Sequence, residues 1–173
     1  MGHTLLLTGR PGVGKTTVVK TVAGALGERA GGFYTEEIRG PGGRKGFRLV
    51  TRDGQETVMA HVNLRGQGRP RVSRYGVDVG AIDRVGVAAL RRAMAEREVI
   101  IVDEIGKMEL FSGQFRDVVL QAVSGRRLVV ATVMSKPNPW VDALKALPQV
   151  EVWEVTMKNR EGMAKRVVEW LKR

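Results

Sequence analysis

The feature that most constrains this chain is a glycine-rich loop placed between a strand and a helix. Residues Thr4 to Thr8 form a short, mostly apolar run typical of a buried strand, and Lys15 to Glu28 places apolar residues at helical spacing. Between them, Gly9 to Thr16 reads Gly-Arg-Pro-Gly-Val-Gly-Lys-Thr and fits the pattern GxxxxGK[S/T]. A strand, a glycine loop and a helix in this order indicate a P-loop, and therefore an α/β fold with parallel strands.

The residue types in this loop suit a bound triphosphate with a magnesium ion. Glycine allows tight turns that bring backbone N–H groups onto phosphate oxygens, and the start of the helix adds the positive end of a dipole. We expect Lys15 to contact the β and γ phosphates, Thr16 to bind Mg²⁺, and Thr17 to assist at the α phosphate. The predicted nucleotide-binding residues here are Gly9, Arg10, Pro11, Gly12, Val13, Gly14, Lys15, Thr16 and Thr17.

A second part of the site is predicted after another buried strand. Residues 99–102 are all aliphatic, and Asp103 and Glu104 follow them. P-loop enzymes hold Mg²⁺ through a carboxylate on a neighbouring strand, so we expect Asp103 to bind the metal together with Thr16. Glu104 is placed to deprotonate the water that attacks the γ phosphate, which makes it the predicted catalytic base. The alternative is that these carboxylates are solvated or cap the next turn.

The loop after the carboxylates supplies further candidates. Ile105, Gly106 and Lys107 continue the predicted nucleotide-binding segment that begins at Asp103. Lys107 is predicted to neutralise charge on the transferred phosphoryl group, as an arginine finger would. The alternative for Lys107 is a surface lysine or a partner for Glu109.

Weaker candidates come from two other segments. Thr132 and Ser135 follow or end the strand expected over residues 128–133, so they could sense the γ phosphate at the edge where ligands collect. Arg10 and the pair Asn159-Arg160 could contact the base or ribose. Asn159 also suits the N-cap of the last helix, and loop arginines are usually solvated.

The segment after the first helix predicts antiparallel strands. Gly31 and Gly32 are expected to break the pattern before the strand that starts at Phe33. Asp53-Gly54 is a dipeptide favoured in turns between antiparallel strands. Residues 63–75 are polar, basic and glycine-containing, which indicates an exposed connection. The strands of this meander are expected at 33–39, 45–52 and 55–62.

The second half of the chain returns to alternating helices and strands. Together with the meander it predicts one P-loop domain over residues 1–173, with a mixed central sheet and helices on both faces. The sheet has a parallel core and an antiparallel meander. Helices are expected near 79–95, 113–123, 140–147 and after 159, and strands at 99–102, 128–133 and 151–155.

Composition excludes several kinds of site. The chain has no cysteine and two isolated histidines, so disulfides and zinc-cysteine sites are excluded and any metal is expected to have oxygen ligands. No apolar run approaches the roughly 20 residues that span a bilayer, so we expect a cytoplasmic protein without a membrane partner. We also expect a monomer. The net charge of +11 allows nucleic-acid binding, but the basic residues are scattered, which favours a solvated, thermophile-like surface.

Four segments occur together and in order. They are the loop from Gly9 to Thr16, the run Gly-Phe-Tyr-Thr-Glu-Glu-Ile-Arg at 32–39, Tyr-Gly-Val-Asp at 75–78, and Asp-Glu-Ile-Gly-Lys-Met-Glu-Leu-Phe at 103–111. With them the chain resembles the THEP1 nucleoside-triphosphatase family over nearly its whole length. The resemblance implies a mixed-sheet P-loop fold and an Mg²⁺-dependent enzyme that releases phosphate from ATP, GTP and other nucleoside triphosphates. It also implies metal and catalytic roles for Asp103 and Glu104, while residues 65–74 depart most from the family pattern.

Three functions fit these motifs to different degrees. A nucleoside triphosphatase uses the P-loop and both carboxylates. A nucleoside or nucleotide kinase would use residues 63–75 as its lid and Glu36 or Glu37 to bind an acceptor hydroxyl. An ATP-regulated nucleic-acid-binding module is suggested by charge alone, because no RNP-type strand or helix-turn-helix pattern accompanies it.

Overall fold

A single nine-stranded sheet forms the centre of the molecule. The computed structural model describes residues 3–173, and its strands lie in the order β5-β6-β4-β3-β2-β7-β8-β1-β9. Strand β7 pairs in parallel with β2 on one side and with β8 on the other, and β1 and β9 continue the parallel order after β8. From β2 outward, each pair is antiparallel: β2 with β3, β3 with β4, β4 with β6, and β6 with β5. We call β2, β7, β8, β1 and β9 the parallel half of the sheet, and β3, β4, β5 and β6 the meander. The strands are β1 Thr4–Thr8, β2 Ala30–Gly40, β3 Gly43–Thr51, β4 Glu56–His61, β5 Arg71–Val72, β6 Tyr75–Val77, β7 Val99–Ile105, β8 Leu128–Val133 and β9 Val150–Glu154.

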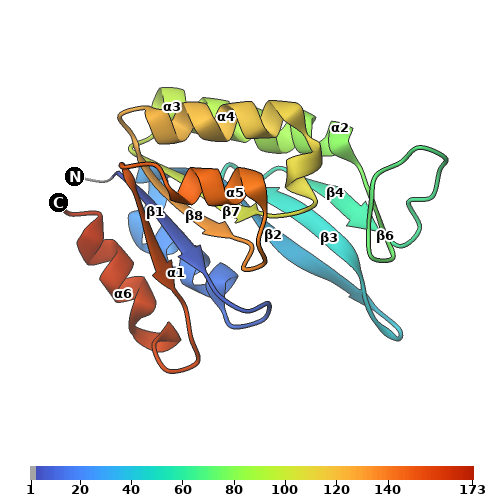
Figure 1. Ribbon diagram of the computed structural model, residues 1–173, viewed down its shortest axis with the longest axis horizontal. Helices are drawn as coiled ribbons and strands as arrows, with labels where there is room; N and C mark the ends of the chain where they lie inside the picture. The colour runs from blue at the N-terminus through green and yellow to red at the C-terminus, as the bar shows by residue number, and fades with distance from the viewer. Residues whose placement is uncertain (1–2) are drawn as a thin grey trace.

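Helices cover both faces of the sheet. Helices α1 and α6 lie on one face, and α3, α4 and α5 lie on the other (Figure 1). Two separate apolar cores result, and consecutive residues of β7 alternate between them: Val99 and Ile101 pack with α1 and α6, Ile100 and Val102 with α3 and α4. The helices are α1 Lys15–Leu26, α2 Val79–Ala81, α3 Ala88–Glu96, α4 Gly113–Ser124, α5 Pro139–Lys145 and α6 Arg160–Trp170, with short turns η1 Gly27–Arg29, η2 Ile82–Val87 and η3 Glu109–Phe111.

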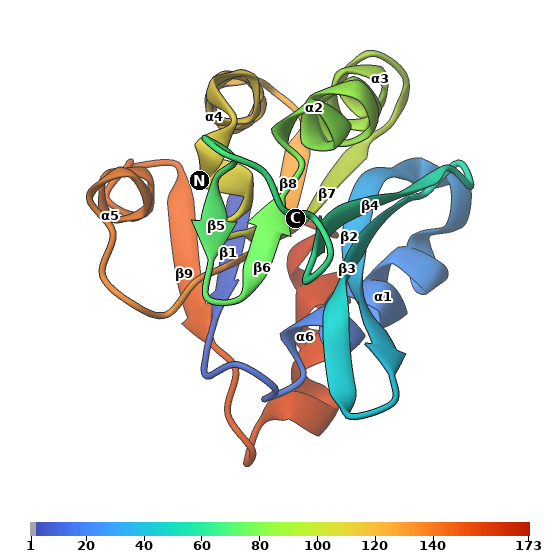
Figure 2. The same ribbon diagram turned by 90° about the vertical axis from the view of Figure 1, so that its right-hand side faces the viewer.

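The expected order of elements is confirmed, and the largest difference lies in the meander. Residues 63–75 contain β5 and the start of β6, which pair as a hairpin whose turn includes Ser73 at φ 53°. The polar composition concealed these short strands, because β5 is only two residues long and lies at the sheet edge. Figure 2 views the molecule from the end of the sheet that carries this hairpin.

Glycine explains a second difference. Gly31 and Gly32 lie inside β2 and do not interrupt it, because the strand starts at Ala30. A Cβ on Gly32 would lie 2.0 Å from the carbonyl oxygen of Ile101, and its φ is 110°. The glycine therefore allows β2 to approach β7 closely.

Two element ends also differ from expectation. Strand β7 continues to Ile105, so Asp103 and Glu104 lie within the strand, where its pairing with β8 is irregular between Val102 and Ile105. Asn159 precedes α6, but its side chain does not cap that helix. Its Oδ1 accepts from the Thr156 N–H, because the chain turns back there before the helix begins. Within residues 3–173, none of the helices has the length and apolar character needed to cross a bilayer.

Candidate active site

The P-loop is a tight turn between β1 and α1. Gly9, Gly12 and Gly14 all have positive φ, at 152°, 79° and 112°. A Cβ on Gly9 would lie 2.6 Å from the Val155 carbonyl oxygen, so a side chain there would collide with backbone. Helix α1 begins at Lys15, and its first turn leaves backbone N–H groups free to bind an anion.

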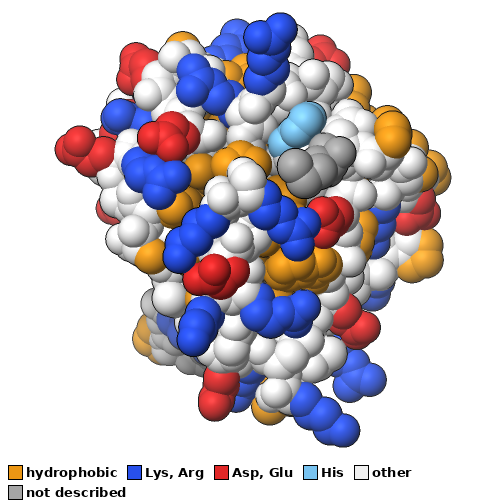
Figure 3. Space-filling view, turned by 90° about the vertical axis from the view of Figure 1, so that its left-hand side faces the viewer, with side chains coloured by type: hydrophobic (Ala, Val, Ile, Leu, Met, Phe, Trp, Pro, Cys, Tyr) orange, Lys and Arg blue, Asp and Glu red, His pale blue; other side chains and the backbone are white. Residues whose placement is uncertain are grey.

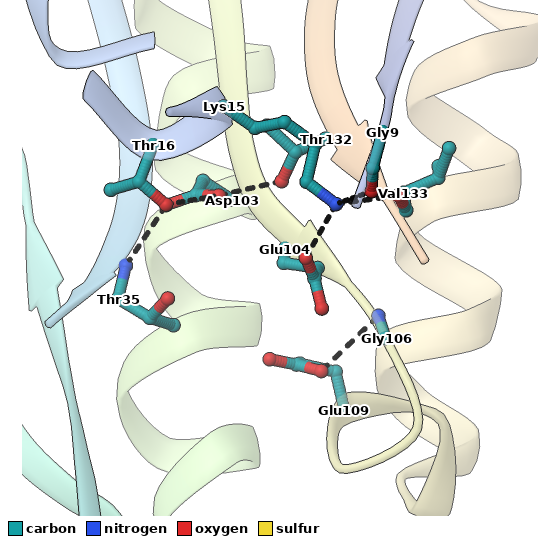
Figure 4. A network of polar contacts seen from close by, with 10 residues as sticks. All are labelled: Gly9, Lys15, Thr16, Thr35, Asp103, Glu104, Gly106, Glu109, Thr132 and Val133. Atoms are coloured by element: carbon teal, nitrogen blue, oxygen red, sulfur yellow. Dashed lines mark hydrogen bonds and ion pairs between the residues drawn. The ribbon is translucent and has the colours of Figure 1, made fainter. Parts of the chain in front are cut away.

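Asp103 lies at the centre of a network that joins four strands or helices (Figure 4). Its Oδ1 accepts from the hydroxyl of Thr132 at 2.5 Å and from that of Thr16 at 3.2 Å. The Thr35 N–H is 3.4 Å from its Oδ2. Asp103 follows Val99 and Ile101 in the strand alternation, so it faces the side of the sheet that carries α1 and Thr16. Burial raises the pKa of Asp103, and the bonds from Thr132 and Thr16 oppose that rise.

Lys15 links the loop to the next carboxylate. Its ammonium donates to the Gly9 carbonyl at 2.8 Å, and its Nζ lies 3.6 Å from Oε2 of Glu104. Lys15 is 8% exposed, whereas the Glu104 side chain is 36% exposed and reaches the cleft described below. Burial raises the pKa of Glu104, while the charge of Lys15 lowers it. The lysine and the glutamate are therefore neighbours at the same point of the site.

Glu109 is the functional candidate that sequence reasoning missed. It is buried, and its Oε2 accepts from the Gly106 N–H at 3.2 Å. A Cβ on Gly106 would lie 2.5 Å from Glu104 Oε1 and 3.1 Å from Glu109 Oε2, so the two carboxyl groups share the space that this glycine leaves. Burial raises the pKa of Glu109 well above its ordinary value, and the charge of Glu104 adds to the rise. The signal for Glu109 in the sequence was its place in the run at 103–111 that carries the family resemblance.

One cleft of about 1000 Å³ contains most of the predicted residues. It runs from the P-loop along the sheet to the meander. Thr132 does not line it, because this side chain is fully buried against Asp103, whereas Ser135 does. The predicted residues that line the cleft are Pro11, Gly12, Gly14, Lys15, Thr16, Thr17, Glu104, Lys107 and Ser135.

Other predicted residues lie outside the cleft wall. The side chains of Val13 and Ile105 pack into the two apolar cores, and Arg10 is exposed. Lys107 is exposed, and within residues 3–173 it forms no ion pair with Glu109. Glu109 instead binds backbone.

Arg160, at the start of α6, lies against the P-loop backbone. Its Nη1 is 3.5 Å from the Val13 carbonyl oxygen, and its Cδ would be 3.7 Å from a Cβ on Gly14. Asn159 beside it holds the preceding turn through Thr156 and Glu154. Only Arg160 of this pair reaches the loop in the structure.

Surface charge is mixed on one face of the molecule. Figure 3 shows lysine and arginine interspersed with aspartate and glutamate on that face, without one continuous basic patch. This pattern accords with the scattered basic residues of the sequence.

Comparison with known proteins gives one consistent result. The model of a family described as NTPase matches residues 4–168. A nucleoside-triphosphatase THEP1 of Thermotoga petrophila is 44% identical, over 97% of this chain and 92% of the relative. The crystal structure of THEP1 from the hyperthermophile Aquifex aeolicus superposes with a TM-score of 0.89 at 38% identity, over 98% of this chain and 99% of that chain.

A more distant solved structure agrees. The solution structure of a human cancer-related nucleoside triphosphatase has a TM-score of 0.84 at 34% identity, and the match covers 99% of this chain and 98% of that chain. The resemblance and the P-loop fold expected from the sequence are confirmed. The chain therefore belongs to the NTPase family whose curated relatives are named nucleoside-triphosphatase THEP1.

Proposed function

We propose that this protein is an Mg²⁺-dependent nucleoside triphosphatase that hydrolyses ATP, GTP and other nucleoside triphosphates to the diphosphate and phosphate, as one domain over residues 1–173. The observation that carries the proposal is the approach of Lys15 Nζ to Glu104 Oε2, 3.6 Å, at the head of a cleft that begins at the P-loop. A phosphate-binding lysine and a base for water are thereby adjacent. The names of the relatives support the same reaction.

The residues around Asp103 fit a magnesium ion. The Thr16 hydroxyl and an Asp103 carboxylate oxygen converge to 3.2 Å, and both are hard oxygen ligands. Within residues 3–173, no cluster of three histidine, cysteine, aspartate or glutamate side chains forms a metal cage. Mg²⁺ does not need such a cage, because it binds through one or two protein oxygens plus substrate phosphates and water. When bound by Thr16 and Asp103, the ion would neutralise charge on the β and γ phosphates.

The P-loop and Lys15 hold the triphosphate. The free N–H groups of the first turn of α1 donate to phosphate oxygens, and Lys15 exchanges its bond to the Gly9 carbonyl for the β and γ oxygens. This exchange also weakens the ion pair between Lys15 and Glu104. Lys107 lines the cleft and supplies a further positive charge as the phosphoryl group is transferred.

Glu104 activates the attacking water. It accepts a proton from the water as the oxygen attacks the γ phosphorus and the bond from that phosphorus to the β-phosphate oxygen breaks. The side chain reaches the cleft, where water has access. Thr132 and Thr35 position the metal-binding group, because both donate to the Asp103 carboxylate that lies beside Thr16.

Loose base preference is supported by the composition of the cleft wall. Among the described residues that line it, none is asparagine, glutamine or aspartate. Asparagine and glutamine are the side chains that typically pair with adenine through two hydrogen bonds, so their absence from this wall supports weak selection of adenine over other bases.

Phosphate release tests the proposal. The protein is incubated with ATP, GTP, CTP or UTP, with Mg²⁺ or with EDTA, and released phosphate is measured. We expect release from all four with Mg²⁺ and background release with EDTA. Release from one base alone would contradict loose preference, and full activity in EDTA would contradict the metal assignment.

A kinase remains the second candidate because the β5–β6 hairpin contributes Val72, Ser73, Arg74 and Tyr75 to the cleft. If phosphate release with MgATP alone stays at the buffer rate until a nucleoside or nucleotide is added, the kinase assignment replaces hydrolysis.

A further inference from the structure

The cleft is longer than the phosphate-binding machinery requires. The P-loop follows β1 and Asp103 lies on β7, two strand positions away, or about 10 Å at the usual strand spacing. The same cleft continues past β7 and β2 to β3 and β6, which lie two and four positions beyond β7, or about 10 to 20 Å further. This outer part lies beyond the Glu104 end of the site and has residues of its own.

Two arginines converge on one buried phenol there. Arg44 on β3 donates from Nε to the Tyr75 hydroxyl at 3.0 Å, and Arg74 points its Nε at the same oxygen from 3.4 Å. The Arg44 guanidinium also lies 5.0 Å from the Phe47 ring centroid and 5.6 Å from that of Tyr75. Tyr75 is 4% exposed, so neighbouring side chains enclose its ring, whereas the Arg44 side chain is 43% exposed.

The positive charge of Arg44 and Arg74 is only partly compensated. Glu37 is the carboxylate that pairs with Arg44, at 3.1 Å, and it also pairs with Arg39 at 2.6 Å. Its neighbour Glu36 is paired with Lys20. Arg39 and Arg44 therefore share the Glu37 carboxylate, and Arg74 forms no ion pair within residues 3–173.

Stacked arginines retain donors for an anion. A guanidinium that lies over an aromatic ring keeps its in-plane N–H groups, which match phosphate oxygens in a bidentate arrangement. Within residues 3–173, Nη2 of Arg44 and Nη1 of Arg74 have no hydrogen-bond partner. Phe47 and Val72, which are partly buried, add apolar wall beside these donors.

We propose that the outer part of the cleft is a second binding subsite, in which Arg44 and Arg74 hold the phosphate of a phosphate monoester while Phe47 and Val72 contact its organic body. A nucleoside monophosphate has this chemistry. The wall of Phe47 and Val72 favours an organic phosphate over inorganic phosphate, which offers no apolar surface. The subsite is distinct from the P-loop, so both ligands can be present at once.

Calorimetric titration of the full chain tests the subsite. The P-loop is first saturated with Mg²⁺ and a non-hydrolysable ATP analogue, so that added AMP cannot bind there. We expect AMP to bind at one site per chain, and adenosine to bind at least 10-fold more weakly because it lacks the phosphate. Equal binding of adenosine, or no binding of AMP, would overturn the proposal. Inorganic phosphate binding as tightly as AMP would overturn the monoester assignment, because the apolar wall would then contribute nothing to binding.

Matched arginine variants assign the site. Arg44→Gln and Arg74→Gln should each weaken AMP binding about 10-fold or more, whereas Arg39→Gln, on the same hairpin but outside the cleft wall, should change it less than 3-fold. Unchanged binding in both cleft variants would refute the assignment, and their melting curves verify that Tyr75 still packs. Displacement of AMP by an unphosphorylated single-stranded oligonucleotide at far lower concentration would replace the monoester with nucleic acid. Binding is measured without turnover, so its failure is separate from failure of the hydrolysis test.

Discussion

In β7, β8 and β1 every strand runs in the same direction, whereas β3, β4 and β6 alternate in direction. The carboxyl ends of parallel strands meet at one edge of a sheet, so the residues that follow β1 and those that end β7 and β8 come together without a long connection. The meander cannot gather residues in this way. It instead builds the wall that extends the cleft beyond Glu104. The residues proposed to carry the reaction therefore lie in the parallel half, and the meander shapes the outer part of the cleft.

Glu104→Gln should give the largest effect, because it removes the base from the parallel half without changing the side-chain size. We expect the turnover rate to fall by about 10²- to 10⁴-fold while triphosphate binding is retained. Phosphate release and binding of a non-hydrolysable analogue measure the two quantities. Normal turnover in this variant would remove Glu104 from the mechanism and weaken the division between the halves.

Gly32→Ala attacks the junction at which β2, the strand leading into the meander, pairs with β7. A methyl group 2.0 Å from the Ile101 carbonyl, at φ 110°, should destabilise the fold by about 3 kcal/mol. Gly54→Ala is the matched control, since Gly54 also has positive φ but has open space around it, and about 1 kcal/mol is expected there. Denaturant unfolding compares them, and equal losses would mean that the close approach of β2 to β7 is unimportant.

Lys15→Ala removes the cation of the P-loop. Because a hydrogen bond to a charged group contributes about 1.5–3 kcal/mol, triphosphate affinity should fall about 10- to 100-fold. Calorimetry with the non-hydrolysable analogue measures the change, and Lys172→Ala, at an exposed position on the C-terminal tail, is the control. Unchanged triphosphate affinity would mean that Lys15, at the P-loop of the parallel half, does not hold the phosphates.

Glu109 gives a smaller, pH-dependent effect. Its folded pKa lies above the ordinary value of 4.5, so above that value the unfolded chain releases a proton that the folded chain keeps. Stability should therefore fall as pH rises from 4.5 through the raised pKa, and Glu109→Gln should show a shallower fall. Urea unfolding at several pH values measures this, with the exposed Glu161→Gln as control. A slope identical to that of the unaltered chain would show that Glu109 does not hold its proton.

Glu98→Gln should have the smallest effect. Glu98 pairs with Arg29 at 3.0 Å at the amino end of the parallel half, and both side chains are more than half exposed. Exposed ion pairs contribute less than about 1 kcal/mol, so thermal unfolding should shift little. A loss comparable to that of Gly32→Ala would mean that the parallel half depends on its surface ion pairs as well as on its apolar cores.

The sequence predicted the parallel half better than the meander for a physical reason. Residues 99–102 of β7 form an uninterrupted apolar run because helices cover both faces of the strand, and such a run can be recognised in a single sequence. Strand β5 pairs with β6, and β6 also pairs with β4, which lies 10 or more residues earlier in the chain. Their pattern carries little local signal, so residues 63–75 read as a loop.

Within the site, the sequence alone determined the local motifs. The P-loop from Gly9 to Thr16, its position between strand and helix, and the carboxylates Asp103 and Glu104 all follow from residue order, because each depends on backbone geometry over a few neighbouring residues.

Only the tertiary structure decided which distant side chains meet these motifs. It brought Thr132 under Asp103 and buried Glu109 beside Glu104. It also extended the same cleft to Arg44 and Tyr75. These contacts depend on strand order and register, which arise from the packing of the whole sheet and leave no local pattern in the chain.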